Sequence, residues 1–323
     1  MRHRFLAVVG AAAVGLTSSA AGSPAKLHGN NFWSNCRFSH TANDDPIVVP
    51  RLPGRSHPHT FFGNVSTNAY STLASLRRAS TTCKPRADTA AYWVPTLFRN
   101  GREVRPAKAQ LYYVVHGYGQ MRAFPAGLRM VAGDAHATSP QSALVTYWDC
   151  AGGPGLRSKP SAAPPARCGI VSGQVLVLRK GEKKLRPMTI RSKTHLELRV
   201  NFPDCWDGKH LGSLDHKSHM AYSRHFVCPP SHPVKVPLIQ LMIRYPISSG
   251  KGLTLSSGGR FSAHADFFNA WDERVLTRLV DECFRDRPCD PEHARTRPSA
   301  EAAKARHALL GGLDEVTASA NSI

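Results

Sequence analysis

Three short segments of the chain place histidine beside histidine or aspartate at spacings that suit metal binding or proton transfer. They are residues 56–63 (SHPHTFFG), 213–222 (SLDHKSHMAY) and 261–269 (FSAHADFFN). Neutral imidazole and carboxylate are ligands for zinc, iron, manganese and copper. A histidine beside a carboxylate can also act as a general base, because its pKa lies near neutrality. The sequence therefore predicts a divalent metal site or acid/base chemistry.

The spacing within these segments decides which side chains can act together. Alternate side chains of an extended strand point to the same side, so His57 can address the same point as His59. The same argument joins His264 to Asp266. In the second segment, the aspartate and the histidines can converge over one turn. If the three segments form one site, their side chains should lie within about 10 Å of a common point, because metal–ligand bonds are about 2.0 to 2.2 Å long.

These patterns give each candidate residue an expected role. The expected metal ligands are His57, His59, His219 and Asp266. The expected catalytic residues are Asp215, His219 and His264. The alternative is a buried hydrogen-bond network of the same histidines that carries no chemistry. Solvent-reachable histidines in a cleft would favour chemistry, and buried histidines each bonded to a backbone carbonyl would favour the network.

Three further residues are candidates for holding a substrate. Arg129 and Lys217 are cations that can bind an acidic group. Trp206 lies in a turn-like stretch, 204–208 (DCWDG), close in sequence to the second histidine segment. An aromatic ring exposed beside carboxylates suits contact with a sugar ring, because one part of the side chain is apolar and another is polar.

The first residues have the features of an export signal. Residues 1–4 are basic, residues 5–16 are apolar or small, and small residues follow, so residues 1–21 are expected to be a signal peptide. The apolar run is shorter than the roughly 20 residues needed to span a bilayer. We therefore expect a secreted or cell-wall-associated protein without stable membrane insertion.

Eight cysteines, all beyond the signal segment, agree with export because disulfides persist in oxidising compartments. No two form a C-x-x-C pair, so a zinc ribbon or a thioredoxin-like site has no support. The sequence alone does not determine their pairing, and our working expectation is that nearest neighbours pair. The expected bridges are Cys36–Cys83, Cys150–Cys168, Cys205–Cys228 and Cys283–Cys289.

The elements that must position these residues are mostly short strands. Runs of β-branched and aromatic residues, broken by Gly, Pro and Asn, predict strands at 92–98, 109–115, 128–132, 144–148, 174–179, 195–202 and 236–245. Apolar residues at three- and four-residue steps from Trp271 to Phe284 predict one amphipathic helix. Strands without alternating helices favour a mainly β fold. We expect an antiparallel β-sandwich or jelly roll with long disulfide-stapled loops and a C-terminal helix.

One domain is expected between residues 27 and 290. Residues 291–323 are rich in Ala and Arg and have few large apolar side chains to bury, so we expect a mobile tail. Within the domain, the stretch 151–167 (AGGPGLRSKPSAAPPAR) lies between two cysteines and predicts a stapled surface loop.

Ten ordered motifs together resemble a known family. They include DDPIV (44–48), SHPHTFFGN (56–64), AYWVPTL (91–97), DHKSHMAY (215–222) and HADF (264–267). The family is a domain-of-unknown-function family of secreted actinobacterial and fungal proteins, whose fungal members are sometimes joined to WSC carbohydrate-binding modules. The resemblance covers residues 27–289. It implies export and a single domain, it points to extracellular or cell-wall polysaccharide as the substrate, and it implies no particular reaction.

The chain is strongly basic, with a net charge of +20. Its Lys and Arg residues are scattered and form no recognition helix, so nucleic acid is not an expected partner. A basic exported protein is attracted to anionic polymers by its long-range field. We expect a monomer whose partner is a polysaccharide or an anionic cell-wall polymer. Two functions stay open: metal-dependent or acid/base catalysis on that polymer, and non-catalytic binding to the cell wall or to carbohydrate.

Overall fold

A six-stranded antiparallel sheet forms from strands in which apolar and polar residues alternate. In β7 (Lys108–Val114), the residues Ala109, Leu111 and Tyr113 are buried and their neighbours are not. This period of two gives the sheet one face for the core and one for solvent. The strand order is β1 (Asn31–Cys36), β7, β17 (Leu238–Arg244), β13 (His195–Asn201), β9 (Thr146–Gly153) and β10 (Leu156–Arg157).

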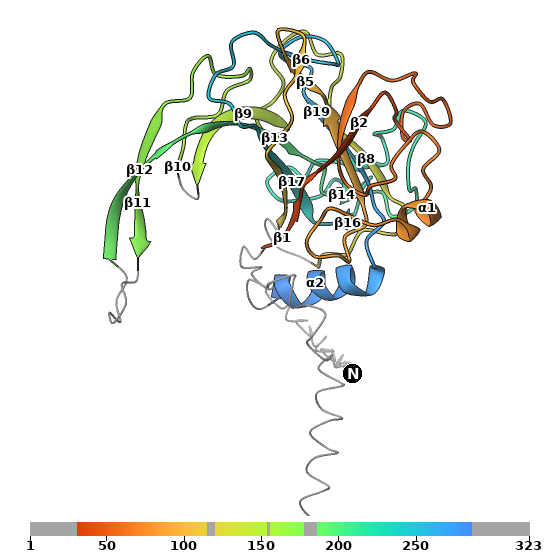
Figure 1. Ribbon diagram of the computed structural model, residues 1–323. Helices are drawn as coiled ribbons and strands as arrows, with labels where there is room; N and C mark the ends of the chain where they lie inside the picture. The colour runs from red at the N-terminus through yellow and green to blue at the C-terminus, as the bar shows by residue number, and fades with distance from the viewer. Residues whose placement is uncertain (1–30, 115–119, 154–155, 178–185, 286–323) are drawn as a thin grey trace, which may run out of the picture.

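A second antiparallel sheet, with five strands, packs against the first (Figure 1). Its inner face shares one hydrophobic core with the first sheet, in which Tyr92 and Phe267 join Leu111 and Ile239. The strand order is β2 (Phe38–Ala42), β3 (His59–Gly63), β4 (Ala91–Pro95), β19 (His264–Phe268) and β8 (Arg129–Gly133). The protein is therefore mainly β and antiparallel, as the sequence predicts.

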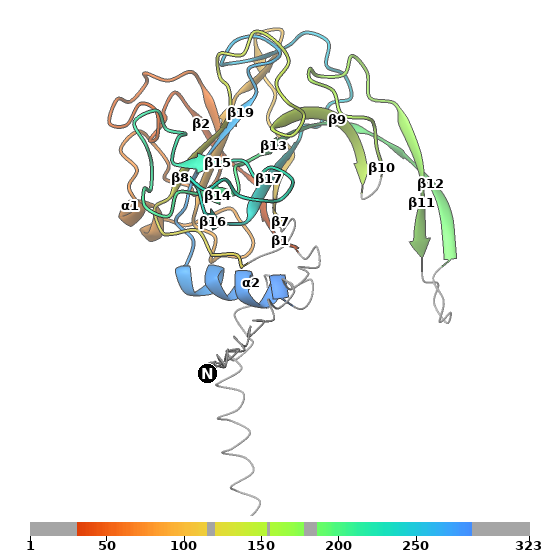
Figure 2. The same cartoon turned by 180° about the vertical axis from the view of Figure 1, so that it is seen from behind.

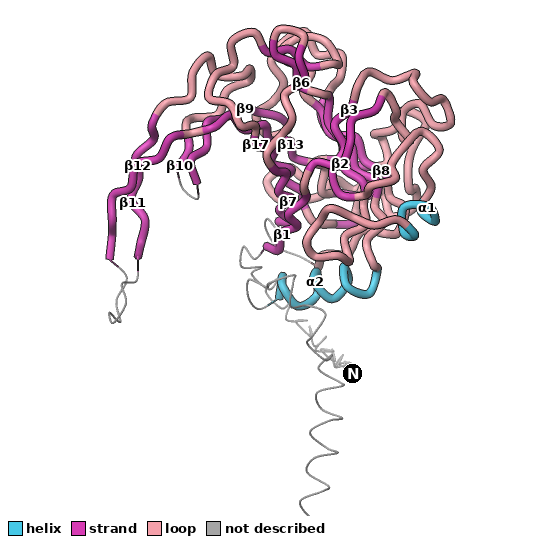
Figure 3. Tube along the Cα trace, viewed as in Figure 1, coloured by secondary structure: helices cyan, strands magenta, loops and turns pink. Residues whose placement is uncertain are grey.

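Loops cover the outer face of the second sheet, so that β3, β4 and β19 are buried on both sides. Ile47, from the loop between β2 and β3, and Leu76, from helix α1 (Leu73–Arg78), pack there against Trp93. Figure 3 shows how much of this side of the molecule is loop. A site on this outer face is consequently built from strand residues below and loop residues above.

The predicted C-terminal helix is α2 (Glu273–Arg285). Leu276, Leu279 and Val280 face the core, and the helix contacts β1. Trp271 precedes the helix and is itself part of the core. No helix among the described residues has the length and apolar character needed to cross a membrane.

Three small sheets complete the architecture. One contains β18 (Leu253–Leu255), β5 (Leu97–Arg99) and β6 (Arg102–Glu103), and another contains β15 (Met220–Ala221), β14 (Cys205–Trp206) and β16 (Val234–Lys235). The third is a hairpin of β11 (Ile170–Val177) and β12 (Arg186–Lys193), which we call the arm. The arm extends away from the two main sheets in both views (Figures 1 and 2). The backbone N–H and the hydroxyl of Thr194 both donate to the carbonyl of Gly169 and close the base of the arm.

The computed structural model describes residues 31–114, 120–153, 156–177 and 186–285. The predicted signal peptide, the predicted tail and Cys289 lie outside these residues. The bridges Cys36–Cys83, Cys150–Cys168 and Cys205–Cys228 are present, which confirms three of the four expected pairs. The stretch 151–167 is stapled as predicted, but it is not all loop, because β9 continues to Gly153 and β10 follows.

Candidate metal centre

The outer face of the second sheet brings the first and third histidine segments together. On β19, Ala265 and Phe267 join the core, so the period of two turns His264 and Asp266 to the outer face. His59 begins β3, two strands away from β19. The ring centroids of His57 and His59 are 4.2 Å apart, and that of His264 lies 5.1 Å from His57 and 5.8 Å from His59. The predicted pairs therefore meet in one cluster.

The donor atoms of this cluster are close enough to share an ion. His57, His59 and His264 each offer a nitrogen within 4.8 Å of the others, and the triad of Asp45, His59 and Asp266 meets the same limit. With bonds of about 2.0 to 2.2 Å, two ligands of one ion are at most about 4.4 Å apart. A small contraction of either triad would therefore suffice. We call these five residues, which could hold an ion, the metal centre.

Asp45 is the member of this centre that sequence reasoning missed. It lies in the loop between β2 and β3, where its Oδ1 accepts hydrogen bonds from the backbone N–H groups of Ile47 and Val48, at 2.8 and 2.9 Å. Burial raises the pKa of this carboxyl group. The sequence signal for it is the DDPIV motif (44–48), in which no histidine lies near the aspartates to indicate a ligand.

Backbone carbonyls fix the tautomers of two histidines in the centre. His59 Nδ1 lies 3.0 Å from the carbonyl of Asp44, and His264 Nδ1 lies 3.0 Å from that of Ser262. A carbonyl can only accept, so in both rings Nδ1 carries the proton and Nε2 keeps its lone pair. Histidines that bind metals are held in this way, with the second ring nitrogen donating to a carbonyl or a carboxylate.

Several buried polar atoms of the centre have no hydrogen-bond partner among the described residues. They are Nε2 of His57, Nε2 of His59 and both carboxylate oxygens of Asp266. His264 Nε2 faces Asp266 Oδ2 at 3.9 Å, which is too long for a hydrogen bond. Leaving a buried donor or acceptor unpaired costs about 1 to 3 kcal/mol. The arrangement is therefore costly unless something else binds these atoms.

Burial also sets the charges of the centre. It lowers the pKa of His59 well below the ordinary value and lowers that of His264 to about 3, so both rings are neutral at physiological pH. Burial, together with the nearby carboxylate of Asp45, raises the pKa of Asp266 well above its usual range. Neutral imidazole is the form that binds a metal ion. A cation between the two carboxylates would favour their ionised forms.

The second histidine segment borders this centre but contributes neither His219 nor Asp215 to it. The two ring nitrogens of His219 are both engaged, Nδ1 with Ser213 Oγ at 2.9 Å and Nε2 with the carbonyl of Arg129 at 2.6 Å. Asp215 is exposed, and its Oδ1 accepts hydrogen bonds from Ser213 and Ser218 of its own loop. These hydrogen bonds lower the pKa of Asp215. Both residues thus hold the shape of the loop.

Lys217 is the residue of the second segment that reaches the centre. Its Nζ donates to the carbonyl of Gly133 at 2.7 Å, and Gly133 lies opposite His264 in the register of β8 and β19. Beside the larger effect of burial, its positive charge lowers the pKa of both His264 and Asp266. Gly133 has φ of +83°, and a Cβ there would lie 2.6 Å from the carbonyl of Ala263, so this close contact requires glycine.

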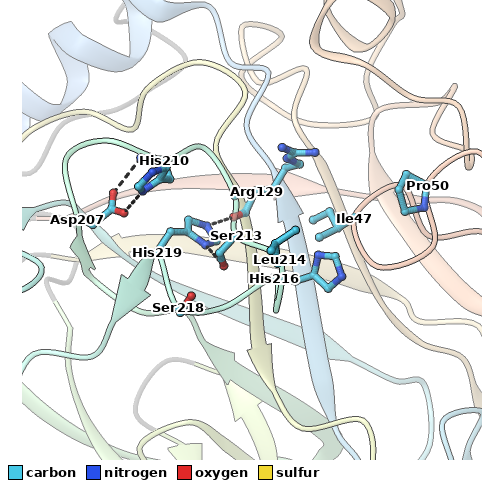
Figure 4. Close-up of a pocket in the computed structure, with 11 residues that line it drawn as sticks. Ile47, Pro50, Arg129, Asp207, His210, Ser213, Leu214, His216, Ser218 and His219 are labelled. Carbon is cyan, nitrogen blue, oxygen red and sulfur yellow. Dashed lines mark hydrogen bonds and ion pairs between the residues drawn. The ribbon is translucent and has the colours of Figure 1, made fainter.

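A pocket of about 700 Å³ is lined by loop residues and by Arg129 of β8, and by none of the five residues of the metal centre (Figure 4). The side chain of Arg129 enters it between the loop that carries Asp207 to His219 and the loop that carries Ile47 and Pro50. Its remaining lining includes His210, Gly212, Ser213, Leu214, His216 and Ser218. Ile47 is two residues beyond Asp45 in the same loop, which ties the pocket to the centre.

The three predicted substrate residues have different surroundings. Arg129 lines the pocket, and Lys217 lies at the edge of the metal centre. Trp206 is half-buried against the hydrophobic core, and its Nε1 donates to the carbonyl of His210 at 2.7 Å. In this structure the indole therefore supports the pocket loop. Of the other residues in the pocket, His210 was not predicted, since its role depends on a loop conformation that no short motif specifies. His216 belongs to the second histidine segment, whose aspartate and histidines were expected to converge over one turn.

Comparison with known proteins and families gives one family match. Neither a curated protein nor a solved structure matches the chain. The domain of unknown function DUF1996 matches residues 45–271, which include Asp45, both predicted pairs of the metal centre and the whole pocket. Because this match covers more than half of the chain, the protein belongs to the DUF1996 family.

Proposed function

We propose that this protein is a metal-dependent enzyme that acts on an extracellular or cell-wall polysaccharide. The metal is a divalent ion held by His57, His59, His264 and Asp266, with Asp45 as a further ligand. The observation that carries this proposal is the set of buried nitrogen and oxygen atoms that meet at one place without a partner. Buried polar groups are almost always hydrogen-bonded or bound to a metal, so such a set calls for an ion.

The burial of His59 and His264, each with Nδ1 bonded to a backbone carbonyl, is what the structural alternative predicts, but that alternative leaves part of the geometry unexplained. A hydrogen-bond network would pair both nitrogens of each ring, as happens in His219. In His59, by contrast, Nδ1 is fixed by a carbonyl and Nε2 is left buried and unpaired. That asymmetry is what a metal ligand needs, and it offers no advantage to a network.

The position of the centre supports catalysis. His57 is only half-buried, which places the centre near the surface, and Ile47 of the pocket lies two residues from Asp45. A divalent ion acts as a Lewis acid and lowers the pKa of a bound water molecule. Lys217 and Arg129 add positive charge at the rim, where a negatively charged group of the substrate could be held.

The choice of polysaccharide has separate support. The three disulfides fit an extracellular protein, and the net charge of +20 favours contact with anionic polymers. The pocket combines hydroxyl and imidazole groups with apolar side chains such as Ile47 and Leu214, a mixture that suits a sugar.

Metal analysis of the full-length mature protein, purified without a histidine tag, tests the metal centre. We expect about one transition-metal ion per chain, lost in His59→Ala and in Asp266→Asn. The exposed His195 on β13 supplies the control, because His195→Ala removes an imidazole far from the centre in sequence and outside both donor triads. If the protein holds no ion and fails to bind zinc, manganese, iron or copper in titrations, the centre is structural.

Activity and binding assays separate catalysis from simple adhesion. A panel of neutral and acidic polysaccharides is incubated with the metal-loaded protein, and the appearance of new chain ends is measured. We expect turnover that disappears in His59→Ala. Retention of a polysaccharide without any turnover would instead favour the second function, non-catalytic binding, which the burial of the centre also permits.

A further inference from the structure

Arg129 has an unusual position for an arginine in a folded protein. Among the described carboxylates, none lies within ion-pair distance of its guanidinium, although the side chain is half-buried. The guanidinium lies over the ring of Phe268, 5.9 Å from the centroid. It also lies close to Gly212, where a Cβ would come within 3.1 Å of Nη2. The side chain thus packs near a ring and the backbone of the pocket loop, and it lines the pocket (Figure 4).

The rest of the pocket does not neutralise this charge. Asp207 is the one carboxylate in its lining, and its Oδ2 is bound to His210 Nδ1 at 2.6 Å. Its Oδ1 accepts from the backbone N–H groups of Lys209 and His210, at 2.8 and 2.9 Å. The pocket therefore contains a positioned guanidinium whose charge is uncompensated, and it is suited to an anionic ligand.

We propose that this pocket is a subsite for an acidic sugar, whose carboxylate binds the guanidinium of Arg129. A guanidinium and a carboxylate match in a planar, two-hydrogen-bond geometry that a lysine cannot reproduce. Ile47, Pro50 and Leu214 offer apolar surface for the C–H groups of the ring, and Ser213 and Ser218 offer hydroxyls. A volume of about 700 Å³ is in the usual range for a small-molecule site.

The strand register connects this subsite to the metal centre. Arg129 lies opposite Phe268, and Val131 lies opposite Asp266, on adjacent strands. The Arg129–Phe268 pair and the Val131–Asp266 pair are two residues apart along the strands and lie on the same face of the sheet, which corresponds to a distance of about 6.6 Å along the strand. A uronic acid held by Arg129 therefore places the neighbouring part of its chain at the metal centre. The proposal rests on the proposed function and narrows the substrate to polysaccharides that contain uronic acids.

The test measures binding of oligogalacturonate to the full-length, metal-loaded protein by isothermal titration calorimetry. We expect Arg129→Gln to weaken binding at least tenfold, and Arg129→Lys, which keeps the charge but not the planar fork, to weaken it to an intermediate degree. The control is Arg122→Gln, because Arg122 is exposed and outside the pocket. Metal content and melting temperature of each variant are measured alongside.

The ligand series separates a sugar carboxylate from other anions. A neutral oligosaccharide of the same length should bind at least tenfold more weakly to the wild type and should not respond to Arg129→Gln. Glycerol phosphate is included as a second anion. The proposal is overturned if oligogalacturonate fails to bind, if Arg129→Gln leaves its affinity unchanged, or if glycerol phosphate binds more tightly than the uronate.

The outcomes also distinguish this inference from the metal proposal. Metal bound through His59, together with unchanged uronate binding in Arg129→Gln, rejects the subsite and keeps the metal centre. Arg129-dependent uronate binding by a protein that never binds metal keeps the subsite and rejects the metal-dependent enzyme.

Discussion

Asp88 is a carboxylate buried in the core, away from the metal centre, and its hydrogen bonds connect both sheets. It accepts from Ser34 Oγ at 2.6 Å and from the hydroxyl of Tyr92 at 3.0 Å. The hydroxyls of Tyr92 and Tyr113 lie 2.6 Å apart, and Trp271 Nε1 donates to Tyr113 at 2.8 Å. Burial raises the pKa of Asp88 from 3.8 to about 7. This residue should therefore give the protein a measurable dependence of stability on pH.

The sign of that dependence follows from proton linkage. Between about pH 4 and 7, the unfolded chain has released a proton that the folded chain still holds at Asp88, so the free energy of unfolding falls as the pH rises. The shift corresponds to on the order of 4 kcal/mol. Urea unfolding at pH 5 and pH 8 should show a smaller difference for Asp88→Asn than for the wild type. The exposed Glu282→Gln serves as the control, and parallel pH profiles for Asp88→Asn and the wild type would contradict the prediction.

At the residue scale, the sequence predicts those ligands whose geometry is local. The spacing of His264 and Asp266 follows from the period of strand β19, whereas His57 lies just before β3, which begins at His59. The structure brings these residues together, as the sequence predicts. Asp45 and His219 are different, because their surroundings come from distant parts of the chain. The carbonyl that binds His219 belongs to Arg129, 90 residues earlier. No local pattern contains that contact.

At the element scale, the arm formed by β11 and β12 makes few contacts with the rest of the molecule. Its main contacts outside the hairpin are with β9 and β10, and most side chains of β12 are exposed. Apart from the arm, the predicted strands match observed strands to within a few residues. In the arm, the predicted strand 174–179 overlaps β11, but no strand was predicted at β12 or at β1 to β3, because the sequences of these strands lack a clear alternation of apolar and polar residues.

Removal of the arm should leave the two sheets and the metal centre intact. Residues 170–193 are replaced by two glycines, which is feasible because Gly169 and Thr194 are already joined by hydrogen bonds. We expect the shortened protein to melt within about 5 °C of the wild type and to keep its metal content, since the lost contacts lie outside the core. Thermal unfolding and metal analysis provide the readouts. A cooperative loss of metal and fold would show that the arm is part of the core structure.

At the scale of the whole molecule, the two main sheets contribute differently to the core and to the candidate site. The six-stranded sheet supplies a large part of the hydrophobic core, while the five-stranded sheet carries the metal centre and pocket on its loop-covered outer face. The overall class could be predicted because it follows from composition and from short strands separated by turn residues. The covering loops could not, because their paths are set by tertiary contacts and by disulfides.

The bridge Cys205–Cys228 spans 23 residues of sequence, and this covalent ring contains Asp207, His210 and the other pocket residues up to His219. The metal centre draws its ligands from outside the ring. The metal centre and the sugar subsite should therefore form at different times. An ion can be bound once the sheets have formed, while the sugar subsite forms only after Cys205 and Cys228 have been oxidised to a disulfide. A chain that has not yet met an oxidising environment would hold metal without binding polymer.

This order of maturation can be measured with Cys205→Ser/Cys228→Ser. Opening the ring should cost about 2 to 4 kcal/mol of stability. We expect the double variant to keep its metal content and to bind oligogalacturonate at least tenfold more weakly, as measured by calorimetry below its melting temperature. Equal losses of metal and of uronate binding would mean that ring and centre form together. Loss of uronate binding alone would show that closure of this disulfide is what prepares the pocket for its ligand.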